Sequence, residues 1–257
     1  IEASRELVGG YLQGFSAGLA FWVVSIWVPG PTKYVLWGIG LAIQLYTPYR
    51  VREIQKRVPL SVTHLPERFG LFTILVLGES IVAVTVGLSH VSWQASTTIV
   101  GVFGLGAATC LWWINFEHHD GFVVRRRGEG KNWRPTVWIY SHLPLAAALA
   151  MLGVSIELAI VGADHGHDYP TAARWLLVSS VALAFASMAA IQFASIRHGQ
   201  EHLRRAAFRA RLIGIPVVLA IGVIPQLPAA WAMSLVTLVC TAEVVADLAA
   251  ANPGALR

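Results

Sequence analysis

The chain has 257 residues, of which 56% are hydrophobic and only 13% are charged. A soluble domain carries about 25% charged residues, so this composition excludes an ordinary soluble enzyme and indicates a polytopic membrane protein. The formal net charge is +5. The basic residues lie in short stretches between apolar segments, as in cytoplasmic loops, and do not form a surface that would follow nucleic-acid phosphates. We therefore expect the lipid bilayer as a partner and no nucleic acid.

Eight apolar segments follow one another along the chain, and each is predicted to be a transmembrane helix. Lipid offers no hydrogen bonds to the backbone, which leaves helices or closed barrels, and these segments lack the alternating polarity of barrel strands. Their predicted ranges are 7–28, 34–49, 68–89, 95–117, 138–162, 172–195, 212–231 and 233–250. Pro225 and Pro228 leave open whether the last two are separate helices or one broken helix. The predicted fold class is all-α, a bundle of about eight transmembrane helices forming a single domain over residues 1–257.

Small residues in the first segment predict close helix packing. Gly10, Gly14 and Gly18 recur at four-residue spacing, which lets the backbone of another helix approach one face closely. The two cysteines, Cys110 and Cys240, lie inside predicted spans. They are expected to pack as small apolar residues, and a disulfide framework is not expected.

The loop charges predict how the helices are oriented. Fourteen Lys and Arg residues lie in the stretches 50–63, 118–137 and 196–211, against two, Lys33 and Arg174, in or beside the alternate loops. Because Lys and Arg are enriched in cytoplasmic loops, both ends of the chain are expected to be cytoplasmic. The basic loops are also expected to contact anionic lipid head groups.

The third segment carries a carboxylate, Glu79, in the middle of an apolar run. An ionisable group at that depth is costly unless it is paired, neutralised or hydrated. Arg68 precedes it on nearly the same helical face by about 16 Å, so we expect Arg68 at the cytoplasmic mouth and not as a direct partner. Glu67 can cap the helix or pair with Arg68. The alternative is that Glu79 is protonated and only hydrogen-bonds a neighbouring helix.

Other candidates gather in the predicted cytoplasmic half. Glu117 ends the fourth segment and His142 begins the fifth. Burial raises the pKa of a carboxyl group and lowers that of histidine, so a Glu–His relay could exchange protons near neutral pH. The alternative for His142 is a packed histidine whose polar atoms are satisfied by neighbours. Glu243 and Asp247 lie four residues apart on one helical face. Both are near enough to the cytoplasmic end to extend towards the interface or to pair with loop charges such as Arg211, and we favour this interpretation for Asp247.

Three stretches have metal-like patterns, but none is predicted to hold a metal. Residues 198–202 match the H-x-x-E-H pattern, yet they lie in a basic loop without an evident third ligand. Residues 118–120 are consecutive, so on a helix they cannot all converge on one ion. Residues 164–168 are expected to form a solvated outer loop. We therefore predict no metal and no cofactor, and we assign no catalytic residue.

Three motifs resemble those of the bacterial low temperature requirement A (LtrA) family. Residues 67–81, Glu-Arg-Phe-Gly-Leu-Phe-Thr-Ile-Leu-Val-Leu-Gly-Glu-Ser-Ile, are similar to the family's hallmark. Residues 112–117, Trp-Trp-Ile-Asn-Phe-Glu, resemble its Trp-Trp-x-Tyr-Phe-Asp motif, and residues 140–144, Tyr-Ser-His-Leu-Pro, resemble its next helix entry. Asn115 and Glu117 depart from the usual Tyr and Asp. The resemblance implies an integral protein of the bacterial inner membrane, linked by name to growth in the cold. Because the chain starts without Met, we expect it to lack upstream sequence, including the family's acidic N-terminal helix.

These observations lead to three hypotheses for the function. The first is a multi-pass transporter or permeation protein with Glu79 as its central ionisable group. Its transport can be coupled to protons. The other residues of its path would be Arg68, Glu67, Glu117, His142 and Glu243. The second is a membrane-embedded enzyme that acts on a lipid or lipid-linked substrate near the cytoplasmic head groups. Its acid/base groups or metal ligands would be Glu67, Glu117, His118 and His142. The third is a non-catalytic membrane scaffold or sensor. The substrate stays open in each case.

Overall fold

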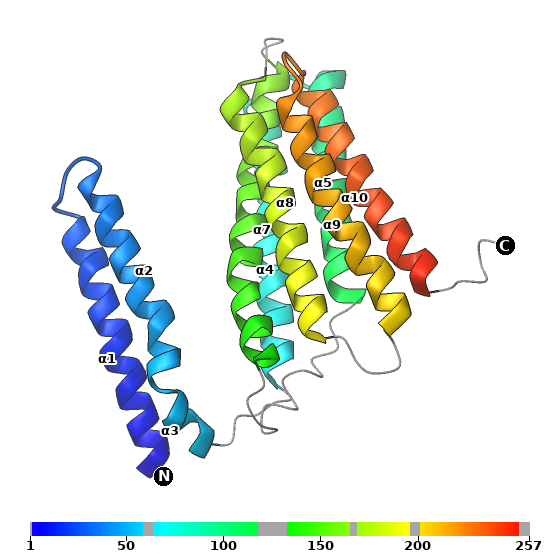
Figure 1. Cartoon of the computed structure of the whole chain (residues 1–257). Coiled ribbons are helices and arrows are strands. Elements are labelled where there is room, and N and C mark those ends of the chain that lie inside the picture. The colour runs from blue at the N-terminus through cyan, green and yellow to red at the C-terminus, as the bar shows by residue number, and fades with distance from the viewer. Residues whose placement is uncertain (1, 59–63, 118–132, 165–168, 196–200, 252–257) are drawn as a thin grey trace. The chain divides into compact units, whose positions relative to one another are not determined.

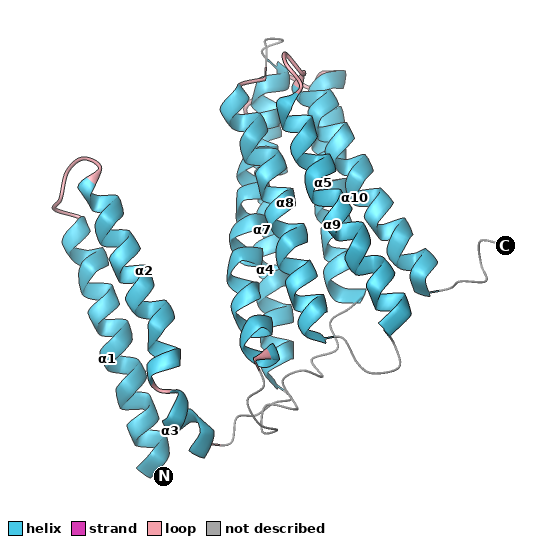
Figure 2. Ribbon diagram, in the orientation of Figure 1, coloured by secondary structure: helices cyan, strands magenta, loops and turns pink. Residues whose placement is uncertain are grey.

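The computed structural model describes residues 2–58, 64–117, 133–164, 169–195 and 201–251. The regular structure within these ranges is helical, and Figure 2 shows no strand among them. The prediction of an all-α fold is confirmed. The chain divides into two compact units, residues 1–61 and 62–257, which we call unit 1 and unit 2.

Unit 1 is a helical hairpin followed by a short helix. Helix α1 covers Glu2–Ser25, α2 covers Thr32–Arg50 and α3 covers Arg52–Arg57. The turn between α1 and α2 contains Gly30 at a φ of 73°, a conformation that glycine adopts at no steric cost. Prolines stand on both sides of Gly30 and cannot continue a helix, so they separate the two long helices. Helix α3 lies inside the stretch 50–63, which was predicted to be a loop.

Glycines bring α1 and α2 into close contact. Gly14 and Gly18 are buried, and a Cβ added at Gly18 would lie 2.6 Å from Cγ of Gln44 and 2.9 Å from the carbonyl oxygen of Gly40. Gly10 has equally little room for a Cβ. Non-bonded carbon atoms pack best at about 3.5–4 Å, so this approach of the backbones depends on the absence of side chains. The predicted packing role of these glycines is confirmed.

Unit 2 is a bundle of six helices within the described ranges. They are α4 (His64–Ser89), α5 (Ala95–Glu117), α7 (Arg134–Asp164), α8 (Thr171–Ser195), α9 (Glu201–Val223) and α10 (Ala229–Ala251). Helix α7 packs against α4, α5 and α8, while α9 packs against α8 and α10, and α10 also packs against α5. Successive helices run in opposite directions, so α5, α8 and α10 end, and α9 begins, at the same end of the bundle (Figure 1).

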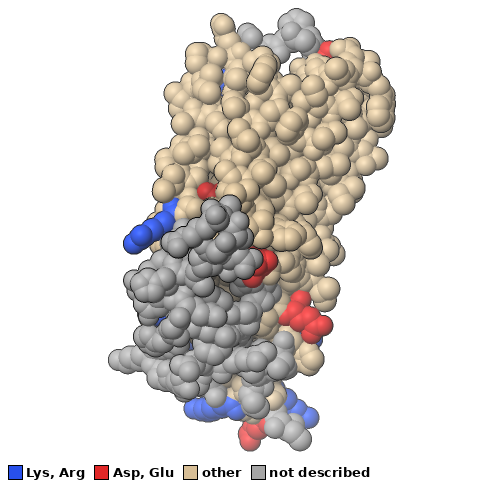
Figure 3. All heavy atoms as spheres, turned by 90° about the vertical axis from the view of Figure 1, so that its right-hand side faces the viewer, with Lys and Arg blue, Asp and Glu red and all other residues tan. Residues whose placement is uncertain are grey.

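Six of the described helices are long and apolar enough to cross a membrane, namely α1, α4, α5, α7, α8 and α10. Their outward faces carry large apolar side chains, such as Leu75 and Ile81 on α4, which are 72% and 61% exposed. Figure 3 shows one face on which charged side chains are nearly absent from the upper part. Extended apolar surfaces of this kind are rare on soluble proteins and fit a lipid bilayer. Helices α2 and α9 are not among the six, so the count of eight spans stays a prediction.

The boundaries of α9 differ from the prediction. The helix begins at Glu201, inside the predicted basic loop 196–211, and ends at Val223, well before the predicted residue 231. Its first turns consist mainly of Arg, Ala, Leu and Glu, which favour helices. Pro225 and Pro228 end it, and Gln226 has a φ of 50° in the turn that follows. Helix α10 then begins at Ala229 and not at 233, so the last two segments are separate helices.

Two arginines that were counted with the loops have side chains buried among helices. Arg211 lies within α9 and is 1% exposed. Arg174 lies in the first turn of α8, and its Nε donates a hydrogen bond of 3.1 Å to the carbonyl oxygen of Gly222. Neither is a loop charge. Without Arg211 the predicted cytoplasmic loops lose one arginine, and without Arg174 the alternate loops also lose one. The excess of basic residues in the predicted cytoplasmic loops therefore remains.

Candidate functional site

Five polar side chains are buried together inside unit 2. They come from α5, α8, α9 and α10, and none is more than 5% exposed. We call this group the ionic cluster: Asn115, Gln192, Arg211, Glu243 and Asp247. Asn115, Gln192 and Asp247 lie within the last turns of their helices. The cluster therefore lies towards the end of unit 2 at which α5, α8 and α10 finish, the predicted cytoplasmic side.

Arg211 connects three helices. Its Nη2 donates to Oδ2 of Asp247 on α10 at 2.6 Å, in an ion pair whose side chains are each 1% exposed. Its Nη1 donates to Oε1 of Gln192 on α8. Burial of a charge is costly unless it is paired and hydrogen-bonded. The two bonds offset that cost and hold α9 against both neighbours.

Glu243 is the second carboxylate of the cluster. It precedes Asp247 by one helical turn, so both side chains are on the face of α10 that packs against α9. A Cβ added at Gly214 would lie 2.5 Å from Oε1 of Glu243, which shows that the carboxylate rests directly on the backbone of α9. The other oxygen, Oε2, is buried and makes no hydrogen bond with the described residues.

A small cavity adjoins the cluster. It measures about 10 Å³ and is lined by Ile114, Asn115, Met188, Ile191, Gln192 and Arg211. A polar cavity of about this size can hold a single water molecule. Nδ2 of Asn115 is buried and has no hydrogen-bond partner among the described residues. The cavity thus offers one unused donor next to the arginine.

The six residues predicted for the path do not form one group. Glu243 belongs to the ionic cluster, and Glu117 at the end of α5 acts electrostatically on Asp247. Glu67 and Arg68 are exposed in the first turns of α4. Oε2 of Glu67 lies 3.4 Å from Nδ1 of His64.

Glu79 is exposed on the surface of unit 2. Its side chain starts beside Gly153 of α7, where an added Cβ would lie 3.2 Å from Cγ of Glu79. The residue that follows, Ser80, is fully buried. The Glu79 carboxylate is therefore on an outward face of α4, apart from the ionic cluster, and its predicted central role stays a prediction.

His142 lies in an aromatic environment between α4 and α7. The ring is 4% exposed, with its centroid 4.3 Å from that of Phe69 and 4.4 Å from that of Trp138. Its Nδ1 is 2.7 Å from the carbonyl oxygen of Trp138, one turn earlier in the same helix. The ring is thus packed between aromatic side chains, and the relay role of His142 stays a prediction.

The pairing of Asp247 with Arg211, one of the two alternatives for Asp247, is confirmed, although Arg211 lies in a helix and not in a loop. Gln192 was missed. The available signal was its position as an amide inside an apolar segment, three residues before the end of α8. The structure brings together no group of three or more His, Cys, Asp or Glu able to hold a metal among the residues that it describes. The stretch 118–120, which includes His118, and most of 164–168 and 198–202 lie outside them.

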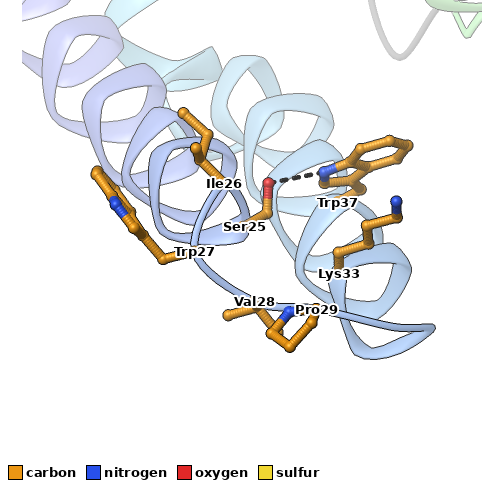
Figure 4. Close-up of a pocket in the computed structure, with 7 residues that line it drawn as sticks. All are labelled: Ser25, Ile26, Trp27, Val28, Pro29, Lys33 and Trp37. Atoms are coloured by element: carbon orange, nitrogen blue, oxygen red, sulfur yellow. Dashed lines mark hydrogen bonds between the residues drawn. The ribbon is translucent and has the colours of Figure 1, made fainter.

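Unit 1 has a separate hollow of about 530 Å³ at the turn between α1 and α2 (Figure 4). Ser25 accepts a hydrogen bond of 2.8 Å from Nε1 of Trp37 and donates one of 2.6 Å to the carbonyl oxygen of Trp22. Nζ of Lys33 lies 5.2 Å from the centre of the Tyr34 ring. The hollow is wide and open, with aromatic side chains and one cation at its rim. Such residues are typical of the membrane–water interface.

Comparisons with known proteins give a family match and a curated relative. The model of the family described as bacterial low temperature requirement A protein (LtrA) matches residues 1–246. An uncharacterized protein of Rhizobium meliloti (strain 1021) is 24% identical over 156 residues, which are 54% of this chain and 37% of that relative. The match thus spans well under half the length of the relative. No solved structure matches the chain.

Proposed function

The chain belongs to the bacterial low temperature requirement A (LtrA) family, and from this premise we propose that it forms a path for a small solute or ion across the membrane. It is a multi-pass bacterial membrane protein with several helices able to span a bilayer. In this proposal the ionic cluster lies on the path, and movement along it is coupled to protons.

The observation that carries the proposal is the fully buried ion pair of Arg211 and Asp247. Apolar residues of similar volume can often replace a buried ion pair without loss of stability. Charged residues inside membrane proteins are rare and commonly mark ion or proton pathways. A second carboxylate and a cavity next to this pair support the same interpretation.

We keep Glu79 as a second ionisable group of the proposal, apart from the ionic cluster, because it is exposed on an outward face of α4. Its position in the middle of α4, a helix able to span the membrane, supports this role, because a carboxylate there is costly without a function. Glu79→Gln provides the test in the full chain. Loss of proton flux and of growth in the cold would support the role, and survival of both would remove Glu79 from the path.

The enzyme hypothesis receives less support from the same geometry. Glu67 and Glu117 are exposed on different helices, and His142 is packed between two rings. General acid–base catalysis needs such groups within hydrogen-bond reach of one substrate. A scaffold, by contrast, would need no buried ion pair. It would predict that changes in the cluster alter stability alone.

The proposed topology has eight spans with both ends in the cytoplasm of the bacterial inner membrane. The basic residues of alternate loops support it, as does the length of α2 and α9, which have 19 and 23 residues. Labelling of cysteines introduced into the turns 90–94 and 224–228 with an impermeant reagent tests it in intact cells. Both turns should react from outside, while a cysteine in α3 should not.

Flux measurements in vesicles test the proposed function. The full-length protein is reconstituted in vesicles of phosphatidylethanolamine and phosphatidylglycerol that contain a pH-sensitive dye, and a pH gradient is imposed. We expect faster decay of the gradient than in protein-free vesicles, and we expect Arg211→Gln and Asp247→Asn to abolish the difference. Arg209→Gln is the matched control, since Arg209 is exposed on the same helix. If the pH gradient decays no faster with the wild-type protein than in protein-free vesicles, proton coupling is contradicted.

A further inference from the structure

Glu243 lies in a space that a missing side chain creates. It is on the face of α10 that packs against α9, and at its level α9 carries Gly214. A Cβ at Gly214 would lie 2.5 Å from Oε1 of Glu243 and 3.1 Å from Cε2 of Phe185 on α8. A Cβ at this position would therefore be too close to the carboxylate, which would have to move. The bundle accommodates this acidic group at 5% exposure.

Among the residues that the structure describes, two carboxylates share one cation in this space. Arg211 directs Nη2 to Asp247 and Nη1 to Gln192, while Oε2 of Glu243 is buried without a hydrogen bond to the described residues. With both carboxylates ionised, the cluster would have an excess negative charge away from water. An uncompensated buried charge is strongly unfavourable. One bound proton would remove that excess.

The groups around Glu243 offer no second cation among the described residues. Arg211 on α9 and Asp247 on α10 act on it electrostatically. Cys240, a buried thiol on α10, also lies near it, and Glu117 on α5 acts on Asp247. Of these groups Arg211 alone can supply a positive charge, and it is already bonded to Asp247.

From this geometry we infer that Glu243 is a proton-binding site, which holds a proton while Arg211 pairs with Asp247. On release, the O–H bond of the carboxyl group breaks and the proton passes to water. The carboxylate that remains competes with Asp247 for the same guanidinium, one helical turn away. Each proton bound or lost therefore changes the force that holds α9 against α10. Use of this proton for transport rests on the proposed function, whereas the proton site itself does not.

Infrared difference spectroscopy of the full-length protein in vesicles tests the inference. We expect a protonated carboxyl band that disappears as the pH is raised, shifts when side-chain ¹³C-labelled glutamate is incorporated, and is lost in Glu243→Gln. The matched control is Glu157→Gln, another carboxylate of unit 2 within a helix, which should keep the band. In Asp247→Asn the freed Arg211 can pair with Glu243, so the band should disappear at a lower pH.

Three results would overturn the inference: a wild-type protein without such a band, a band that the ¹³C-glutamate label does not shift, or a band that persists in Glu243→Gln. The label needs no substitution, so the test holds even if a variant does not fold. Proton flux from the same vesicles separates the two proposals. A band that depends on Glu243 without flux would refute transport and keep the site, while flux without the band would refute the site and keep transport.

Discussion

Replacement of Gly214 by alanine should displace the Glu243 carboxylate without removing it. The new methyl group would lie 2.5 Å from Oε1 of Glu243 and 3.1 Å from the Phe185 ring, against a normal contact of about 3.5 Å. The end of the flexible glutamate side chain must move by about 1 Å, and the buried ring by about 0.4 Å. Overpacking costs about 1–3 kcal/mol, whereas alanine stabilises a helix by about 1 kcal/mol relative to glycine. We therefore expect a net destabilisation of about 0–2 kcal/mol.

Gly78→Ala is the matched control, since an alanine Cβ on that residue of α4 would meet nothing within 4 Å. It should gain about 0.5–1 kcal/mol from helix propensity. Thermal unfolding of the full chain in detergent, followed by far-ultraviolet circular dichroism, compares the two variants. The carboxyl band should titrate at a changed pH in Gly214→Ala only. If Gly214→Ala is as stable as Gly78→Ala and titrates like the wild type, the assignment of Glu243 to this space is refuted.

Three further predictions concern the ion pair, the hairpin and the turn of unit 1. Arg211→Met and Asp247→Leu should each destabilise the protein by about 3–5 kcal/mol in thermal unfolding, and the double variant should recover most of the loss; additive losses would show that the pair is not coupled. Gly18→Ala should cost about 1–3 kcal/mol, because its Cβ meets the carbonyl oxygen of Gly40, whereas Gly38→Ala has open space and should cost nothing. Equal unfolding midpoints would argue against close packing. A spin label at Trp27→Cys, with the native cysteines replaced, should report the depth of the lipid interface, and a depth near the bilayer centre would contradict that placement.

Most helix positions could be predicted because a membrane requires long apolar runs. Helix α5 covers 95–117 and α8 covers 171–195, within one residue of the predicted ranges. The four-residue spacing of Gly10, Gly14 and Gly18 predicted a face for close approach, and the glycines do lie against α2 and the residue that follows it. These features depend on local sequence, which is why they could be read without a structure.

The composition of the ionic cluster could not be predicted in full. Its arginine was placed in a loop because basic residues mark cytoplasmic loops, whereas a run of helix-forming residues extends α9 through that stretch. The orientation of Glu79 was equally hidden. Helix α4 is apolar around most of its circumference, so hydrophobic periodicity does not distinguish its faces. Which side packs inward depends on the neighbouring helices.

The arginine of α9 has a consequence for how the protein is made. Helix α9 leaves the ribosome before α10, so Arg211 first meets the membrane without Asp247. Insertion of an unpaired arginine costs about 2.5–3.5 kcal/mol at the centre of a helix, and α9 is not among the helices apolar enough to span by composition. We therefore expect α9 to wait at the translocon and to enter the bilayer together with α10, as a hairpin joined by the short turn 224–228. A nascent chain truncated after Val223 should leave α9 outside the lipid.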